Sequence, residues 1–229
     1  MKRVLVTGST GWIGSYCVPL LKERGFEVLR LKYIPAFPKH DHDSFQSEVP
    51  EEIFHQADYC LYLGWITDHG EYWQAPKNIE CIAQCINFIR IFHRRKGQRI
   101  VVAGTQAERG DSLYGISKDS LRRLLAAYCR ETGLSYGWGR IYNVYGKGED
   151  EQRLIPAIKR QIENRHIQRW IKKQKFTSKH DYLHVSEVAR RLVELLDSDT
   201  QGIVEIKSGV ERTIPELIEW VKSDDFKKS

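Results

Sequence analysis

Short apolar runs alternate along the chain with longer segments in which apolar residues recur at helical spacing. The first run, 2–7, predicts a strand, and the segment 13–24 that follows it predicts a helix. Further strands are predicted at 27–31, 59–63, 99–103, 135–141 and 203–206, and further helices at 78–94, 117–132, 185–196 and 215–222. Strands and helices in alternation are typical of an α/β protein whose parallel sheet carries crossover helices on both faces.

The turn between the first strand and the first helix is rich in glycine. Gly8 permits a tight turn, Gly11 lets the backbone approach a pyrophosphate, and Gly14 allows the helix to pack closely on the strand. The free N–H groups and positive dipole of the helix N-terminus favour phosphate groups. We therefore interpret the turn as a Rossmann-like dinucleotide site rather than as a turn without a ligand. The expected cofactor contacts are Gly8, Thr10, Gly11, Trp12, Ile13 and Gly14.

Two segments interrupt the alternation of strands and helices. The loop 35–50 is rich in Pro, His and Asp, and the segment 147–179 is polar and basic. We predict a Rossmann-like doubly wound parallel sheet in a dinucleotide-binding domain over 1–146, continued by 181–209. A small C-terminal annex on the substrate side is predicted to comprise 147–180 and 210–229.

The end of the second predicted strand bears on the choice of cofactor. Dinucleotide sites that take NAD place an acidic residue there, which bonds the ribose hydroxyls. This chain has Lys32 at that position and Arg30 two residues earlier. A cation attracts a 2′-phosphate, so the sequence favours NADP(H) over NAD(H). The alternative is that Lys32 simply points to solvent.

A tyrosine and a lysine lie four residues apart near the start of a predicted helix. This spacing puts Tyr114 and Lys118 on one helix face. An ammonium group close to the phenol lowers its pKa and makes the tyrosine a usable acid or base. Thr105 directly follows the fourth predicted strand, at the sheet edge where ligands bind, and its hydroxyl is expected to bond the same substrate oxygen. The alternatives are a chance spacing for the pair and a turn-forming role for the threonine.

The formal net charge of +6 is concentrated in the segment 159–175. We considered a solvated helix face, help with an anionic substrate and nucleic-acid binding as its role. Nucleic acid is the least favoured partner, because no RNA- or DNA-binding motif accompanies the basic segment.

The five cysteines are odd in number and scattered. Cys81 and Cys85 lack a matching Cys or His pair, so we expect no metal site and reduced, buried thiols in the cytoplasm. We expect no membrane span, because no apolar run approaches the ~20 residues that a spanning helix needs. We also expect no signal peptide, because the N-terminal apolar run is too short.

Motifs spread over nearly the whole chain resemble those of the extended short-chain dehydrogenase/reductases, in the NAD-dependent epimerase/dehydratase group that acts on nucleotide sugars. Segments 7–14 and 114–118 are similar to the TGxxGxxG and YxxxK motifs of that group. The other segments that carry the resemblance are 58–65, 76–78, 140–146, 153–156, 181–185 and 204–209.

The resemblance implies functions for individual residues. It implies that Thr105, Tyr114 and Lys118 are catalytic, and that Tyr114 and Lys118 also contact the cofactor. It implies cofactor contacts at Leu63, Gly64 and Trp65, and substrate contacts at Thr105, Gln106, Asn143 and Arg153. It further implies a homodimer formed through the segments 78–94 and 117–132. The chain departs from the group in its short annex, in the brief link from Thr105 to Tyr114, and in His180 where an arginine is usual.

We predict an NADP(H)-dependent ketoreductase acting on a nucleotide-linked 4-keto-6-deoxy sugar. The alternatives are a nucleotide-sugar epimerase that uses the same residues and a non-catalytic NADP-binding regulatory module. A dehydratase is disfavoured, because Gln106 and Ala107 stand where dehydratases of the group carry an Asp-Glu pair. Glu108 follows on what we expect to be a strand-like extension, where a shift of one residue points its side chain the other way.

Overall fold

A computed structural model of the chain describes residues 2–31, 54–66, 70–167, 178–223 and 226. Its main body is a sheet of six parallel strands in the order β2-β1-β3-β4-β5-β8. The strands are β1 (Arg3–Thr7), β2 (Glu27–Leu31), β3 (Tyr59–Tyr62), β4 (Arg99–Thr105), β5 (Ser135–Ile141) and β8 (Gly202–Ile206). The predicted α/β class and the parallel doubly wound sheet are confirmed.

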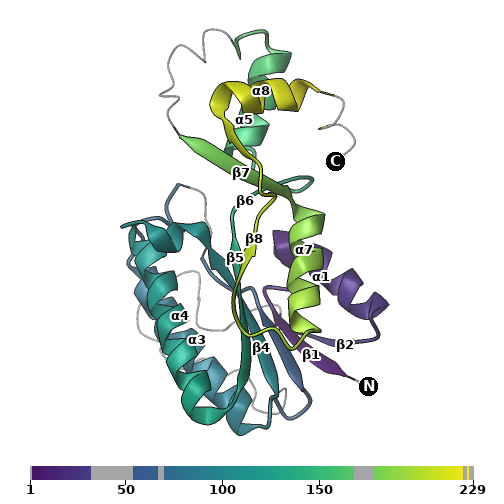
Figure 1. Cartoon of the computed structure of the whole chain (residues 1–229), viewed down its shortest axis with the longest axis vertical. Helices are drawn as coiled ribbons and strands as arrows, with labels where there is room; N and C mark the ends of the chain where they lie inside the picture. Colours follow the sequence, from purple (N-terminus) through teal and green to yellow (C-terminus); the bar gives the residue numbers. More distant parts are fainter. Residues whose placement is uncertain (1, 32–53, 67–69, 168–177, 224–225, 227–229) are drawn as a thin grey trace.

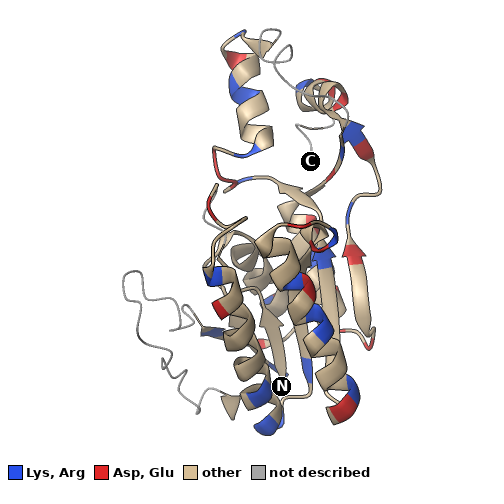
Figure 2. Ribbon diagram, turned by 90° about the vertical axis from the view of Figure 1, so that its left-hand side faces the viewer, with Lys and Arg blue, Asp and Glu red and all other residues tan. Residues whose placement is uncertain are grey.

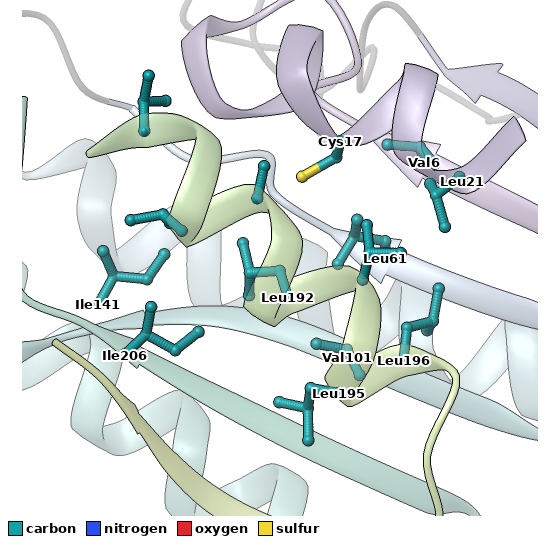
Figure 3. Packing of buried hydrophobic residues seen from close by; sticks show 14 of the residues in the cluster. Val6, Cys17, Leu21, Leu61, Val101, Ile141, Leu192, Leu195, Leu196 and Ile206 are labelled. Atoms are coloured by element: carbon teal, nitrogen blue, oxygen red, sulfur yellow. The ribbon is translucent and has the colours of Figure 1, made fainter. Parts of the chain in front are cut away.

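Helices cover both faces of this sheet (Figure 1). α1 (Trp12–Glu23) and α7 (Val185–Leu196) lie on one face, and α3 (Lys77–Arg94) and α4 (Leu113–Thr132) lie on the other. Figure 3 shows Leu192 and Leu195 of α7 on the side of the helix that faces the sheet, with Leu195 beside Val101. Because the apolar residues of α7 repeat every three to four positions, they form one continuous buried stripe.

A second, smaller unit lies beyond the carboxyl ends of the strands, at the top of Figure 1. It has a sheet of β6 (Asn143–Tyr145), β7 (Lys179–His184) and β9 (Glu211–Thr213). Among the described residues, the unit also contains the helices α5 (Leu154–Glu163) and α8 (Ile214–Lys222). Their apolar faces share a core that includes Ile155, Ile158 and Leu217.

The second sheet contains two segments that we predicted to belong to the dinucleotide-binding domain. Residues 143–145 form β6, and residues 181–184 belong to β7, which pairs with β6 in parallel. The bulk of 1–146, together with α7 and β8, builds the large sheet. The division of the chain into two domains stays a prediction.

All five cysteine thiols are buried and free, which agrees with the expectation of reduced thiols. Within the described ranges, no helix combines the length and the hydropathy that a membrane crossing requires. In those same ranges, no group of His, Cys, Asp and Glu is placed to hold a metal ion. Figure 2 shows Lys and Arg interspersed with Asp and Glu along the helices, so the visible face carries charges of both signs. Of the basic segment 159–175, residues 168–175 lie outside the described residues.

Candidate active site

The glycine-rich turn brings α1 against the carboxyl ends of β1 and β3. Gly8 has a φ of +66°, in the left-handed region that favours glycine. A Cβ on Gly14 would lie 2.2 Å from the carbonyl oxygen of Gly8, so no larger residue fits there. The backbone N–H of Gly11 donates to the same oxygen at 3.0 Å. The packing that the sequence predicted for Gly8 and Gly14 is therefore present.

The residues expected to lie along the cofactor adjoin this turn. The Thr7 hydroxyl oxygen accepts from the backbone N–H groups of Leu63 and Gly64, both at 3.0 Å, and so ties the end of β1 to the segment after β3. Gly11 caps α1 without a side-chain hydrogen bond. The first N–H groups of α1 are thus free of a side-chain cap, and this arrangement of glycine backbone and helix N-terminus fits a pyrophosphate.

Of the two cations expected to select NADP(H), one can be placed. Arg30 is exposed near the carboxyl end of β2, paired in register with Val6 of β1. Lys32 lies outside the described residues.

Thr105 ends β4 and begins a single turn of 3₁₀-helix, η1 (Gln106–Arg109). Its hydroxyl oxygen accepts from the backbone N–H of Ala107 at 3.2 Å, while its own N–H donates to Glu108 Oε1 at 2.7 Å. The expectation of a strand-like extension was wrong, because this capping box turns the chain into a helix. The pattern Thr-x-x-Glu was available in the sequence as an indication of that turn.

Glu108 is buried beneath Thr105, and both of its carboxylate oxygens accept hydrogen bonds. Its Oε1 also accepts from Trp138 Nε1 at 2.8 Å, and its Oε2 accepts from Arg140 Nε at 3.0 Å. A carboxylate held by these donors is an anchor of the sheet edge. Both of its oxygens are occupied in this way, and the expectation against elimination chemistry stays a prediction.

Tyr114 lies in the first turn of α4, which begins at Leu113, four residues before the predicted start. Ser112 caps this helix by accepting from the backbone N–H of Gly115 at 3.1 Å. The Tyr114 ring packs edge-on against the rings of Tyr72 and Trp73, with centroid distances of 4.9 and 5.7 Å. The Thr105 side chain lies close enough to the Tyr114 phenol to lower its pKa.

The sequence predicts a lowered pKa for Tyr114, but in the protein without ligands this pKa is raised. Burial raises the pKa of its phenol above the ordinary value, and the nearby Thr105 side chain offsets this rise only in part. Lys118, the group expected to lower this pKa, directs its ammonium elsewhere. Lys118 Nζ donates to the carbonyl oxygen of Ala103 at 3.0 Å and lies 4.0 Å from the centroid of the Trp65 ring.

Hydrogen bonds link the residues around Lys118. The indole N–H of Trp65 donates to Asn78 Oδ1 at 2.8 Å, and Asn78 is itself buried and bonded to backbone carbonyl groups. Burial lowers the pKa of Lys118 to about 8. An ammonium held over an indole face is stabilised by the ring quadrupole. Trp65, predicted as a cofactor contact, therefore also contacts the catalytic lysine candidate.

Two expected substrate contacts bridge the large sheet and the second sheet. Gln106 Nε2 donates to Asn143 Oδ1 at 3.0 Å, and Asn143 Nδ2 donates to the carbonyl oxygen of Asp181 at 3.0 Å. Arg153, at the start of α5, places its guanidinium carbon 5.2 Å from the centroid of the Trp12 ring. Its charge also lowers the pKa of Tyr114. The expected substrate residues thus lie near both the glycine-rich turn and the tyrosine.

Sequence reasoning missed Glu149, whose Oε1 lies 3.6 Å from Arg153 Nε. The i,i+4 spacing of an acidic and a basic residue was visible in the sequence, but the burial of the carboxylate was not.

Comparison with known proteins identifies relatives of the whole chain. The model of the NAD dependent epimerase/dehydratase family matches residues 4–206. UDP-glucuronic acid decarboxylase 1 of Arabidopsis thaliana is 25% identical over 96% of this chain, which spans 58% of that protein's length. A dTDP-6-deoxy-L-talose 4-dehydrogenase (NAD(+)) of Aggregatibacter actinomycetemcomitans is 20% identical, with 95% of this chain and 88% of the relative covered.

Solved structures share the fold at low sequence identity. A UDP-N-acetylglucosamine 4-epimerase from Methanobrevibacter ruminantium M1, in complex with UDP-N-acetylmuramic acid, superimposes with a TM-score of 0.74 and 20% identity over 97% of this chain and 83% of the neighbour. MoeE5 in complex with UDP-glucuronic acid and NAD gives a TM-score of 0.75 and 21% identity over 96% and 81% of the two chains. Both neighbours confirm the Rossmann-like architecture.

Proposed function

Because the chain belongs to the NAD dependent epimerase/dehydratase family, we propose that it is an NADP(H)-dependent ketoreductase of a nucleotide-linked 4-keto-6-deoxy sugar. The observation that carries this proposal is the placement of the Thr105 and Tyr114 hydroxyls near each other at the carboxyl edge of the sheet. The dehydrogenase relative, whose name gives position 4 of a dTDP-linked 6-deoxy sugar, supports net oxidoreduction.

The residues at this edge have the chemistry that carbonyl reduction requires. When bound, a reduced nicotinamide supplies the hydride. The Thr105 hydroxyl hydrogen-bonds the substrate oxygen, and Tyr114 gives it a proton. The buried Lys118 ammonium adds positive charge beside the site as negative charge develops. A high pKa of Tyr114 in the protein alone keeps its proton in place until substrate arrives.

Purified protein is expected to oxidise NADPH in the presence of a dTDP- or UDP-linked 4-keto-6-deoxy sugar. It is expected to form no 4-keto-6-deoxy product from the corresponding hexose. The Glu108 carboxylate is held by Trp138 and Arg140, and the side chains of Gln106 and Ala107 exchange no proton. Absorbance of NADPH and mass spectrometry of the sugars check both statements. Appearance of the dehydrated sugar would overturn the reductase assignment.

The second candidate is an epimerase, which is favoured by the 4-epimerases among the structural neighbours. It would use the same Thr105, Tyr114 and Lys118 and return the hydride to the sugar. Interconversion of two sugar epimers without net loss of NADPH would select this candidate.

We propose NADP(H) over NAD(H) because the exposed Arg30 stands near the end of β2, followed by Lys32. Wild type is expected to bind NADPH more tightly than NADH, and Arg30→Asp is expected to lose that preference, since a carboxylate repels the 2′-phosphate. Tryptophan fluorescence titrations of both proteins with both cofactors measure the difference. Equal wild-type affinities would contradict this choice of cofactor.

We propose a homodimer that pairs through α3 and α4. Ile79 on α3 is 59% exposed, and Ile116 and Leu124 on α4 are each 50% exposed. These exposures are high for large apolar side chains, so we expect a second subunit to cover them. Light scattering is expected to give twice the chain mass of 26.8 kDa, and a monomeric mass would refute the dimer.

We propose that the protein works in the cytoplasm. Free thiols persist in a reducing compartment, and all five cysteines are free.

A further inference from the structure

The guanidinium of Arg153 is poorly satisfied within the protein. Its side chain is 32% exposed and lies by the Trp12 ring, at the N-terminal end of α1. Among the residues that the structure describes, none accepts a hydrogen bond from this guanidinium, and its ion-pair partner is Glu149 at 3.6 Å. A guanidinium presents several N–H donors in a planar fork that matches a phosphate. Unused donors beside a helix N-terminus therefore point to an anionic ligand.

The Glu149 carboxylate is more deeply buried than its partner. Its side chain is 4% exposed, and its Oε1 is buried without a hydrogen-bond partner. The charged and titratable groups that act on it are Arg153 and Lys159 of α5, Glu151 of its own loop and Tyr182 of β7. Of the two cations, Arg153 lowers the pKa of Glu149 more than Lys159 does. A buried carboxylate that loses its counter-ion becomes costly to keep ionised.

We propose that Glu149 is the counter-ion that Arg153 gives up when the diphosphate of a nucleotide sugar binds, and that Glu149 takes up a proton in exchange. Arg153 then pairs with the diphosphate, and the carboxyl group becomes neutral in its buried position. The proton comes from solvent through a cavity of about 550 Å³ that Glu149 lines together with Lys147, Lys159 and His184. Glu149 is thus a positioning residue that acts through Arg153, and the inference rests on the proposed function.

The direction of the pH dependence follows from the free protein. Burial raises the pKa of Glu149 to about 7, even with Arg153 beside it. Neutralisation of Arg153 by a diphosphate raises the pKa further, because the lowering effect of the cation is then lost. Between these two pKa values binding consumes a proton, so affinity falls as the pH rises above about 7.

The test measures binding of UDP-glucose and dTDP-glucose by calorimetry at about pH 6.5 and about pH 8.5, in buffers of different ionisation enthalpy. Their pyrophosphate diester keeps a constant charge over this range. Wild type is expected to bind about tenfold more weakly at the higher pH and to take up close to a full proton there. Glu149→Gln is expected to bind equally at both pH values, to match wild type at low pH, and to exceed it about tenfold at high pH, because glutamine mimics the neutral acid.

Two further variants separate the possible failures. Glu151→Gln removes a charge from the same loop at a side chain that is 84% exposed, and is expected to keep the proton uptake and the weaker binding at high pH. Arg153→Gln is expected to weaken binding at both pH values and to remove the proton uptake. Weaker binding of Glu149→Gln at both pH values, or wild-type binding without proton uptake, overturns the exchange while the nucleotide-sugar function stands. Binding of neither nucleotide sugar by wild type overturns the proposed function, and with it the exchange.

Discussion

Tyr114→Phe is expected to lower turnover by about 10²–10⁴-fold, the contribution of a positioned acid or base. The variant keeps the ring, and with it the edge-on contacts with Tyr72 and Trp73, so the fold is expected to persist. Steady-state assays with the keto sugar and NADPH measure the loss, and circular dichroism confirms folding.

A matched control removes a hydroxyl elsewhere on α4. The Tyr128 hydroxyl bonds His93 Nδ1 at 3.1 Å on the outer side of α4, toward α3. Tyr128→Phe is therefore expected to keep wild-type turnover. Equal turnover in the two variants would show that Tyr114 is not the proton donor.

Glu108→Ala is expected to destabilise the protein by about 3–5 kcal/mol, because it removes the buried carboxylate from its ion pair with Arg140. Arg140 is 10% exposed at its side chain and keeps Glu205 at 2.8 Å, but loses the carboxylate that holds its Nε. The Trp138 indole N–H and the Thr105 backbone N–H lose their acceptor as well. The free energy of unfolding, measured with urea, gives the difference.

Glu131→Ala is the matched control for the loss of a carboxylate. Its pairing with Arg130 is exposed, with the two side chains 75% and 74% accessible, and such pairs contribute under about 1 kcal/mol. If Glu108→Ala were no less stable than Glu131→Ala, Glu108 would not anchor the edge of the sheet.

Long periodic elements were predictable from the sequence because apolar spacing alone defines them. β2, β5 and α7 have the predicted bounds. β6 and β9 have three residues each, which is too short for a periodic pattern. The start of α4 was missed because its first turn depends on the Ser112 cap and not on apolar spacing.

The candidate site was predictable in its residues but not in its contacts. Helical spacing places the Cβ atoms of Tyr114 and Lys118 on one face, but a lysine side chain is long enough to carry its ammonium away from the tyrosine. Here the ammonium lies between the Ala103 carbonyl and the Trp65 ring. The burial of Glu149 likewise depends on how the second unit packs, which no local pattern contains.

The path of the chain between the two sheets limits how the second unit can be altered. Within the described residues, the chain passes between the sheets at Tyr142, at the junction of His184 with Val185, and along 207–210. A fragment that ends after β6 would lack β8, and so would leave one edge of β5 unpaired and open to association. The second unit therefore cannot be exchanged as a single insertion. Grafting the corresponding unit of another protein onto the large sheet would require matched joins at each of these crossings.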